Sequence, residues 1–385
     1  MAAMEKNNKT LNVPNLRFPE FSGEWERTRF ERVVSLQRGS SPRPIIEYIT
    51  KSSEGVNWVK IGDMPKYGRV VTSTEEKITK EGAKKSRHVN VGDLILSNSM
   101  SYGQPYIMNI EGYIHDGWFV LKSFENSFDR DYLCNLLISP AVQNQYRRLA
   151  AGGVVQNISS DLVNSVMVSL PSIKEQHKIA SFLNLIDDRI ATQRKVIEKY
   201  ESLIRGLYHS VFNNPSSILQ LREVVSVVKG KQINGEELLE EGKYYVMNGG
   251  TEPSGYLDEY NTPANTISIS EGGNSCGYVQ YNTEPFWSGG HCYSLHQKDE
   301  GVNYQYLYHF LKYKERDIMA LRIGSGLPNV QKKDLERFEI RVLPIEQQNR
   351  VAEILEDISA KCDLEKKILQ EWQWQKSFLL SNLFI

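Results

Sequence analysis

The chain has 385 residues, of which 40% are hydrophobic, enough for two or three domains with sizeable cores. It has no apolar run of about 18 residues and no apolar signal core in residues 1–10, so we expect a cytoplasmic protein without a membrane span. The formal net charge of −1 excludes a protein that coats nucleic acid through bulk charge, but not one that reads DNA through local basic patches.

The first half predicts a mixed α/β domain over residues 25–171, after an N-terminal segment of residues 1–24. A helical region at about residues 129–149 precedes its last strand. Stretches rich in β-branched and aromatic residues predict strands at residues 58–61, 89–97, 106–110, 118–121 and 166–170.

A long helix is predicted over residues 172–213. Ser172 fits its N-cap, with Glu175 reaching back in a capping box. Asn213-Asn214-Pro215 ends it, because Asn tolerates a left-handed cap and Pro cannot continue a helix. Between these ends, positions spaced four and three residues apart form a heptad seam: Ile179, Leu183, Ile186, Ile190, Gln193, Ile197, Tyr200, Ile204, Leu207 and Val211.

The second half predicts the same order of elements, with an α/β domain over residues 214–343 and a final long helix over residues 344–385. A helical region at about residues 303–321 again precedes the last strand. The predicted strands are residues 244–247, 266–270, 278–281, 292–295 and 338–342. The seam of the final helix is Val351, Leu355, Ile358, Cys362, Glu365, Leu369, Trp372, Lys376, Leu379 and Leu383.

The two halves are copies of one scaffold. Asp161-Leu162 recurs as Asp334-Leu335 at an offset of 173, and Gly103 recurs as Gly277 at an offset of 174. The domain beginnings match at a larger offset, 191, so the first copy carries an insertion before Ile95. Matching positions are mostly apolar or glycine, whereas the polar residues between them differ. Two copies of one scaffold with different surfaces should bind two different targets.

The two long helices are predicted to pair with each other. Each has near 40 residues and would span about 60 Å, too long for one small domain. If the halves are related by a pseudo-twofold axis, the helices run antiparallel, with the domains at opposite ends. We hypothesise that Gln193 and Glu365, at the same repeat position, meet near the axis and fix the register. The fold class is therefore α+β: two mixed α/β domains in pseudo-twofold repeat, separated by an antiparallel coiled coil.

Polar, aromatic and basic loops between the strands are candidate contacts to DNA. Basic side chains would meet phosphates, although a solvated face explains such runs equally well. Asn, Ser and Gln side chains can read base edges in the major groove, although any one of these loops is as readily a plain turn. The candidates are Lys66, Tyr67, Arg69, Lys84, Lys85, Arg87, Ser97, Asn98, Ser99, Tyr102 and Gln104 in the first half, and Asn248, Gly249, Gly250, Tyr256, Asn274 and Ser275 in the second.

Motifs for catalysis and for metal binding are missing. The sequence has no GxxxxGK[ST] phosphate loop and no Asn/Asp-Pro-Pro-aromatic motif of amino-methyltransferases, so we predict no catalytic residue. The cysteines, Cys134, Cys276, Cys292 and Cys362, lack CxxC spacing, so we expect buried free thiols. His291 beside Cys292 is too little for a metal site, and we predict none.

Three motifs resemble those of the specificity subunits of type I restriction–modification systems. Residues 13–21, Val-Pro-Asn-Leu-Arg-Phe-Pro-Glu-Phe, followed by Gly23-Glu24-Trp25, are similar to the N-terminal stretch of this family. Leu170-Pro171 with Glu175-Gln176, and Leu343-Pro344 with Glu346-Gln347, resemble its two central boundary motifs, and the second is one residue shorter. Together with two domains and two helices, the resemblance extends over nearly the whole chain.

The resemblance implies a non-catalytic, DNA-reading subunit. Each domain would be a target-recognition domain that reads one half of a split, asymmetric site in double-stranded DNA, and the helices would set the unread spacer. Two modification subunits would dock on the chain, bind S-adenosylmethionine and methylate an adenine in each half-site. Two restriction subunits would add ATP- and Mg-dependent translocation and cleavage. The resemblance thus implies no cofactor in this chain and no membrane partner.

Two other functions stay open at this point. The chain could be a non-DNA scaffold whose two domains bind protein or glycan ligands, or an enzyme with an unrecognised site. Salt-dependent binding to duplex DNA would distinguish the DNA-reading protein from the scaffold. Activity of the chain alone, lost on a single carboxylate substitution, would indicate the enzyme.

Overall fold

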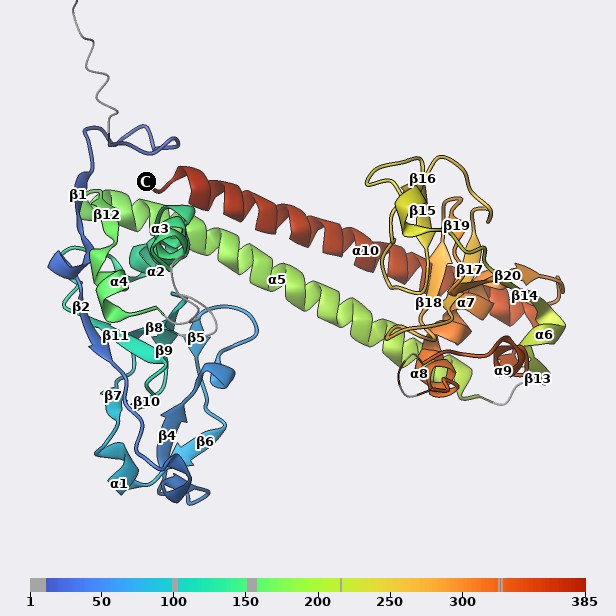
Figure 1. Cartoon of the computed structure of the whole chain (residues 1–385), viewed down its shortest axis with the longest axis horizontal. Helices are drawn as coiled ribbons and strands as arrows, with labels where there is room; N and C mark the ends of the chain where they lie inside the picture. Colours follow the sequence, from blue (N-terminus) through green and yellow to red (C-terminus); the bar gives the residue numbers. More distant parts are fainter. Residues whose placement is uncertain (1–11, 99–102, 151–157, 215–216, 325, 327) are drawn as a thin grey trace, which may run out of the picture. The chain divides into compact units, whose positions relative to one another are not determined.

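The structure is a computed structural model that describes residues 12–98, 103–150, 158–214, 217–324, 326 and 328–385. It consists of two compact units (Figure 1). Unit 1 is residues 1–195 with 367–385, and unit 2 is residues 196–366. The helices α5 (Ile173–Phe212) and α10 (Ile345–Asn382) each contribute to both units. Each compact unit therefore combines a mixed α/β domain with segments of both helices, and the predicted domain bounds stay a prediction.

Unit 1 contains two five-stranded sheets and a two-stranded ribbon. The ribbon pairs β1 (Glu26–Arg29) with β12 (Met167–Leu170). One sheet has the order β2 (Ser35–Arg38), β11 (Trp118–Lys122), β8 (Leu94–Ser97), β9 (Pro105–Met108) and β5 (Val70–Val71). The other has the order β3 (Ile49–Thr50), β6 (Glu76–Ile78), β4 (Val56–Val59), β10 (Gly112–Ile114) and β7 (Arg87–Val89).

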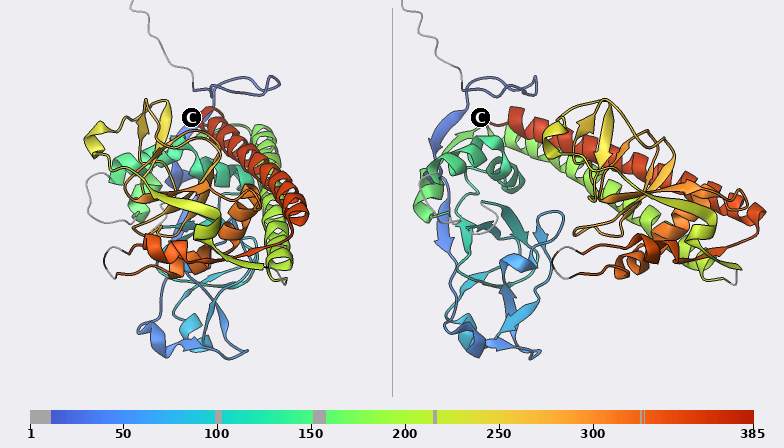
Figure 2. Two further views of the ribbon diagram at one scale, coloured as in Figure 1. Left: turned by 90° about the vertical axis from the view of Figure 1, so that its right-hand side faces the viewer. Right: turned by 45° about the vertical axis from the view of Figure 1, so that its right-hand side comes forward.

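The helices of unit 1 divide between its two ends. The helices α2 (Arg130–Ile138) and α3 (Pro140–Ala150) lie beside α5, whereas β3, β4, β6 and α1 (Lys80–Ala83) lie at the end remote from it (Figures 1 and 2). Helix α4 (Ser160–Ser165) leads into β12, and three short 3-10 helices, η1 (Phe30–Arg32), η2 (Ile45–Glu47) and η3 (Ile61–Asp63), complete the unit.

Unit 2 repeats this plan in a smaller form. Its ribbon pairs β13 (Ser217–Gln220) with β21 (Glu339–Val342). A four-stranded sheet has the order β14 (Val225–Lys229), β20 (Cys292–Gln297), β17 (Thr266–Ser270) and β18 (Val279–Asn282), and a smaller one the order β16 (Tyr256–Leu257), β15 (Tyr244–Met247) and β19 (Trp287–Ser288). Its short helices are α6 (Leu221–Val224), η4 (Gly235–Glu237), α7 (Tyr304–Tyr313), α8 (Glu315–Ala320) and α9 (Lys332–Glu336).

Most predicted elements are present, with shifted ends. The prediction of one strand over residues 89–97 was wrong, because the chain turns between β7 and β8. Gly92 adopts a positive φ of 92° there, and the Asn90 N–H bonds to the Asp93 carboxylate at 2.9 Å. Each predicted helical region is broken into two helices, the first before Pro140 and the second at Lys314. One strand of each two-stranded ribbon, β1 and β13, was not predicted, whereas their partners β12 and β21 were.

Strand pairing confirms the internal repeat. Glu26 pairs with Leu170 in the first ribbon and Ser217 with Val342 in the second, so equivalent strands form equivalent ribbons. Gly39 and Gly230 are also equivalent, and both are confined by backbone. A Cβ added at Gly39 would lie 2.0 Å from the carbonyl oxygen of His115. A Cβ added at Gly230 would lie 2.2 Å from the carbonyl oxygen of Gly289. No larger residue fits either place, which explains why this glycine recurs although the surrounding polar residues differ.

The sheets that contain β4 in unit 1 and β15 in unit 2 locate the insertion in the first copy. In both units a strand pairs in parallel with a later one, β4 with β10 in unit 1 and β15 with β19 in unit 2. The residue numbers at which β4 and β15 start differ by nearly the 191 found at the domain beginnings. Those of β8 and β17 differ by about the 173 found later in the chain. Most of the insertion therefore lies between β4 and β8, where unit 1 has β5, β6 and α1.

The long helices pack together in both units and do so in opposite directions. In unit 1 the first turns of α5, with Ile179 and Leu183, share a core with Leu383 and Phe384 from the end of the chain. In unit 2 the last turns of α5, with Phe212, share a core with Leu355 from the early turns of α10. The beginning of each helix thus meets the end of the other, which confirms the antiparallel pairing.

Each α/β domain packs against an aromatic residue at the far end of a long helix, Phe212 at the end of α5 and Phe384 just after α10. Phe384 packs on Tyr132 of α2, with ring centroids 5.2 Å apart, and Phe212 packs on Tyr306 of α7 at 5.4 Å. Tyr132 and Tyr306 are equivalent in the repeat, and so are Phe384 and Phe212. The C-terminus therefore completes the core of the first domain, a role that α5 has in the second.

The start of each long helix is fixed by a buried glutamine. In unit 1 Gln176 accepts a hydrogen bond from the Asp129 N–H at 2.9 Å and donates to the Pro171 carbonyl at 3.1 Å. In unit 2 the same bonds are made by Gln348, to the Asn303 N–H at 2.8 Å and the Leu343 carbonyl at 2.7 Å. The match of Gln176 to Gln347 suggested by the boundary motifs was therefore wrong, and Gln348 is the equivalent residue.

The predicted N-cap of the first long helix is confirmed, but not the whole capping box. The hydroxyl of Ser172 accepts from the Glu175 N–H at 3.3 Å. The Glu175 carboxylate does not reach back; it pairs with Arg17 at 2.7 Å and accepts from the Trp25 indole at 3.3 Å. Glu175 is buried, and it ties the N-terminal segment to the start of α5.

Candidate nucleic-acid interface

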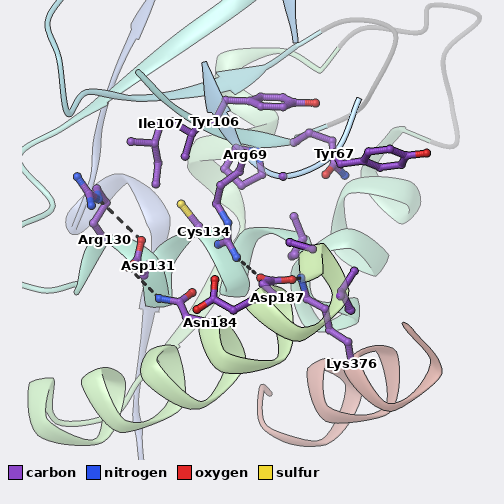
Figure 3. Close-up of a pocket in the computed structure, with 18 of the residues that line it drawn as sticks. Tyr67, Arg69, Tyr106, Ile107, Arg130, Asp131, Cys134, Asn184, Asp187 and Lys376 are labelled. Carbon is purple, nitrogen blue, oxygen red and sulfur yellow. Dashed lines mark hydrogen bonds and ion pairs between the residues drawn. The ribbon is translucent and has the colours of Figure 1, made fainter. Parts of the chain in front are cut away.

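Four of the predicted contact residues of the first domain line one cavity beside the long helices. Lys66, Tyr67 and Arg69 lie on the loop before β5 and border a cavity of about 1020 Å³ (Figure 3). Gln104, which precedes β9, borders it too. The other walls come mainly from β9, α2, α5 and the last turns of α10. The loop before β5 thus lies against the helices of unit 1.

Arg69 is held inside the protein, so we correct its predicted role as a phosphate contact. Its guanidinium pairs with Asp187 of α5 at 2.6 Å and is mostly buried, and it also donates to the Asn135 side chain at 3.3 Å. Asp187 pairs in addition with Lys376 of α10 at 2.5 Å. Burial lowers the pKa of Lys376, although the Asp187 carboxylate opposes that shift.

Tyr67 and Lys66 form the outer edge of the same loop. The guanidinium of Arg194, on α5, lies 4.1 Å from the centroid of the Tyr67 ring, and the Lys66 ammonium lies 5.2 Å from it. Tyr67 is about half exposed. This edge presents two cations and an aromatic face, the groups that bind phosphates and stack on bases.

The second predicted basic group lies at the other end of the domain. Lys84 and Lys85 follow α1, and Arg87 begins β7; all three are exposed. The Lys85 ammonium lies 4.6 Å above the Tyr48 ring, and the Arg87 guanidinium donates to the Arg38 carbonyl at 3.2 Å. The structure leaves these three side chains available at the surface, and their role as phosphate contacts stays a prediction.

Two arginines that the sequence analysis missed contact Asp116, and one of them, Arg38, also accepts a hydrogen bond from Arg87 at its carbonyl. Arg43 pairs with the Asp116 carboxylate at 3.3 Å, and Arg38 donates to the Asp116 carbonyl at 3.3 Å. Both arginines are exposed. They are far from Asp116 along the chain, so no local sequence pattern could have grouped them. The three arginines form a basic surface near the predicted base-reading loop.

The predicted base-reading loop of the first domain begins inside the protein. Ser97 is fully buried, and its hydroxyl accepts from the Gln104 N–H at 3.0 Å, so its predicted contact with DNA was wrong. Asn98 is also buried and donates to the Asp116 carbonyl at 2.9 Å, which anchors the loop beside the arginines. Ser99 and Tyr102 lie outside the described residues.

In the second domain, the predicted loop at Asn248 contacts the loop before β20. The Asn248 side chain accepts from the His291 N–H at 3.0 Å, and the Gly249 carbonyl accepts from the Ser270 hydroxyl at 2.7 Å. Gly249 has a φ of 86°, a conformation that favours glycine. Gly250 follows it at the partly exposed tip. Tyr256 is not in this loop: it pairs with Tyr245 in the sheet, so a loop position for it was wrong.

A buried carboxylate organises the recognition loops of the second domain. Glu271 pairs with Lys229 at 2.6 Å, accepts from the Tyr293 hydroxyl at 3.1 Å and lies 3.6 Å from the His291 ring. Beyond it, Gly273 donates to the Pro328 carbonyl at 3.0 Å, so the loop carrying Asn274 is held at both sides. Asn274 is exposed and Ser275 is half-buried, which leaves both near the surface.

The prediction of buried free thiols is confirmed, and the predicted meeting of Gln193 and Glu365 is untested. The four cysteines are buried and form no disulfide, and burial raises the pKa of Cys134 and of Cys292 to about 11. Within the described ranges, no cluster of three or more potential metal ligands is present, and no helix is long and apolar enough to cross a membrane. Gln193 belongs to unit 1 and Glu365 to unit 2, so their proposed meeting stays a prediction.

Comparison with known proteins decides the family. The type I restriction modification DNA specificity domain matches the chain twice, over residues 23–201 and 215–372. The chain belongs to the type I restriction–modification DNA specificity family. The duplicated match corresponds to the two recognition domains, each with part of a long helix. The predicted identity as a DNA specificity subunit is thereby confirmed.

Relatives and solved structures agree with this assignment. A putative type I specificity subunit of Mycoplasma genitalium is 27% identical over 63% of this chain and 68% of its own length. The putative MjaX specificity subunit of Methanocaldococcus jannaschii is 22% identical over 97% of this chain and 96% of its own. The crystal structure of the S subunit from M. genitalium has a TM-score of 0.69 at 20% identity, covering 97% of this chain and 99% of that one. This likeness confirms the fold.

Proposed function

We propose that this specificity subunit reads a bipartite, asymmetric DNA site, with one half-site bound by each recognition domain. The proposal rests on one observation: equivalent positions of one scaffold carry different chemistry. The loop after β8 starts at Asn98, an amide that bonds to Asp116 beside Arg38 and Arg43, whereas the loop after β17 starts at Glu271, a carboxylate with Lys229 and His291. Donors and acceptors arranged so differently suit different base edges. Two dissimilar half-sites follow.

We further propose that the paired helices set the spacer and receive the modification subunits. Packed helices are stiff, and their length fixes the separation of what they carry. In unit 1 they expose large apolar side chains, with Trp374 65%, Leu185 63% and Phe378 49% exposed, and the rings of Trp374 and Phe378 stack at 6.0 Å. Exposed aromatic residues of this size are typical of protein interfaces.

Catalysis and cofactors belong to the partners in this proposal. S-adenosylmethionine would bind to two modification subunits, and ATP and Mg to two restriction subunits. This chain would supply DNA reading and assembly without catalysing a step. Its four free thiols fit the reducing cytoplasm, where we expect it to act on DNA.

Sequencing of modified adenines tests the proposal. The chain is expressed with its modification subunit in a host that lacks other adenine methyltransferases, and methylated sites are mapped genome-wide. We expect one motif with two specified halves, a fixed unspecified gap and one methylated adenine in each half, on opposite strands. A contiguous motif, or a motif unchanged when this chain is exchanged for another specificity subunit, would refute it.

A further inference from the structure

The loop before β5 contacts both long helices of unit 1, and three contacts carry this arrangement. Arg69 pairs with Asp187 at 2.6 Å, and Asp187 pairs with Lys376 at 2.5 Å (Figure 3). The Arg194 guanidinium lies 4.1 Å from the centroid of the Tyr67 ring. A single carboxylate on α5 thus joins the recognition domain to α10. We call residues 66–70 together with Asp187, Arg194 and Lys376 the strut.

The strut uses a face of α5 that differs from the heptad seam. Asn184, Asp187, Ala191 and Arg194 follow one another at spacings of three and four, so they share one side of the helix. Asn184 donates to Asp131 of α2 at 3.0 Å, and the other three border the same cavity as the loop. The seam residues Ile186 and Ile190 are buried beside them. Helix α5 therefore holds its partner helix on one side and the recognition domain on another.

The position of the strut along the helix gives it mechanical leverage. The apolar contact of the domain with α5 is centred on Ile179 and Leu183, near the start of the helix. Asp187 lies about one turn after Leu183, and Arg194 lies three turns after it, about 16 Å further along the axis. Two contacts that far apart resist rocking of the domain on the helix, whereas one contact would act as a pivot.

The strut is specific to the first recognition domain. The loop that supplies Tyr67 and Arg69 lies between β4 and β8, in the segment that is longer in the first copy. The residue of α10 equivalent to Asp187 is Ser359, which carries no charge, and the equivalent of Arg194 is Lys366. Lys366 pairs with Glu201 of α5 at 3.8 Å, within the helix pair.

We propose that the strut is a positioning device that fixes the angle of the first recognition domain on the helices, and that Asp187 is its central residue. This inference rests on the proposed function, because the angle matters only if the domain reads one half-site at a fixed distance from the other. A domain that rocks on its helix can meet its half-site at more than one distance. The strut therefore makes the complex selective for one spacer length.

Substitution of Asp187 tests the proposal in the complex with the modification subunit. Asp187→Asn removes the charge that Arg69 and Lys376 share while keeping the side-chain volume. Duplexes with both half-sites and with spacers one base pair shorter, equal and one longer are methylated in competition. We expect the preference for the native spacer to fall by about tenfold, as for loss of one charge-assisted hydrogen bond, with both half-site sequences unchanged.

Two further variants separate positioning from general damage. Asp188→Asn changes the neighbouring exposed carboxylate and should keep the spacer preference. Tyr67→Ala removes a half-exposed ring, so it should leave the melting temperature unchanged and still relax the preference. Unchanged spacer preference in both folded Asp187→Asn and Tyr67→Ala would overturn the strut. A wild-type complex without a preferred spacer would overturn the proposed function instead.

Discussion

Single carboxylate residues hold the recognition loops in place. Glu271 follows β17 and Asp116 precedes β11, and each lies beside the start of a loop proposed to read bases. Each gathers cationic or donor groups from segments far apart in sequence. We expect such residues to act on specificity by positioning their neighbours, because their own carboxylates are already engaged. Exposed residues on the same loops, such as Asn274, stay candidates for contact with a base edge.

The recognition loops should change one half-site at a time. We expect Asn274→Ala to relax the second half-site at one position, because loss of a base-edge contact costs about 1–3 kcal/mol, and to leave the first half unchanged. We expect Asn98→Ala to affect only the first, through the loop it anchors. Mapping of methylated sites for each variant measures this. A change in the opposite half-site would contradict the assignment of the loops.

His309 should make the stability of unit 2 depend on pH. It is buried on α7 beside Tyr208, whose hydroxyl lies 3.0 Å from its Nδ1, and burial lowers its pKa to about 4. The unfolded chain, with a histidine pKa near 6.5, therefore binds more protons between the two values, and stability falls as the pH drops through this window. From pH 7.5 to pH 5 the loss should be about 2 kcal/mol.

A variant that cannot titrate isolates this contribution. His309→Gln keeps a polar side chain on α7 but binds no proton. Urea unfolding of the wild type and the variant at pH 7.5 and pH 5 measures the difference. Equal pH dependence in the two proteins would show that His309 titrates as it does in water.

At the scale of elements, the junction between each recognition domain and its long helix is the most constrained part of the fold. Gln176 bonds to the backbone just before α2 and just before α5. Gln348 bonds to the backbone just before α7 and just before α10. One side chain thus sets the position of two helix starts. The ribbons β1–β12 and β13–β21 lead into these same junctions.

Neighbouring glutamines at the second junction offer a matched test. Gln348→Ala should destabilise the protein by about 1–3 kcal/mol, because a buried N–H and a buried carbonyl lose their partner. Gln347→Ala, at an exposed position, should change stability by less than about 0.5 kcal/mol. Chemical denaturation measures both. A larger loss of stability in Gln347→Ala than in Gln348→Ala would instead make Gln347 the equivalent of Gln176.

At the scale of the whole molecule, the two units share two continuous helices, so a change of helix length should be transmitted to both recognition domains. We expect insertion of one heptad after Gln193, with a matching heptad after Glu365, to keep the seam in register. One heptad adds about 10 Å, close to three base pairs. Methylation mapping should find both half-sites unchanged and the spacer longer by about that amount. An unchanged spacer would exclude the helices as the ruler.

A heptad inserted in α5 alone provides the control. It shifts the seam of one helix against the other, so the packing of Leu383 and Phe384 or of Phe212 is disturbed. We expect lower thermal stability and weaker methylation, with no new spacer. A clean change of spacer from the single insertion would show that the helices do not need to stay paired.

The sequence by itself determined the repeat, the fold class, the two long helices and the family. These follow from periodicity and from recurring apolar and glycine positions, which reflect local geometry and survive divergence of the surface. Only the tertiary structure decided which polar residues face outward. Arg69 and Ser97 look like DNA contacts in the sequence but are held by Asp187 and Gln104, whereas Arg38 and Arg43 gather at Asp116 from distant loops. A side chain's partner depends on which distant segments the fold brings beside it, and periodicity carries no such information.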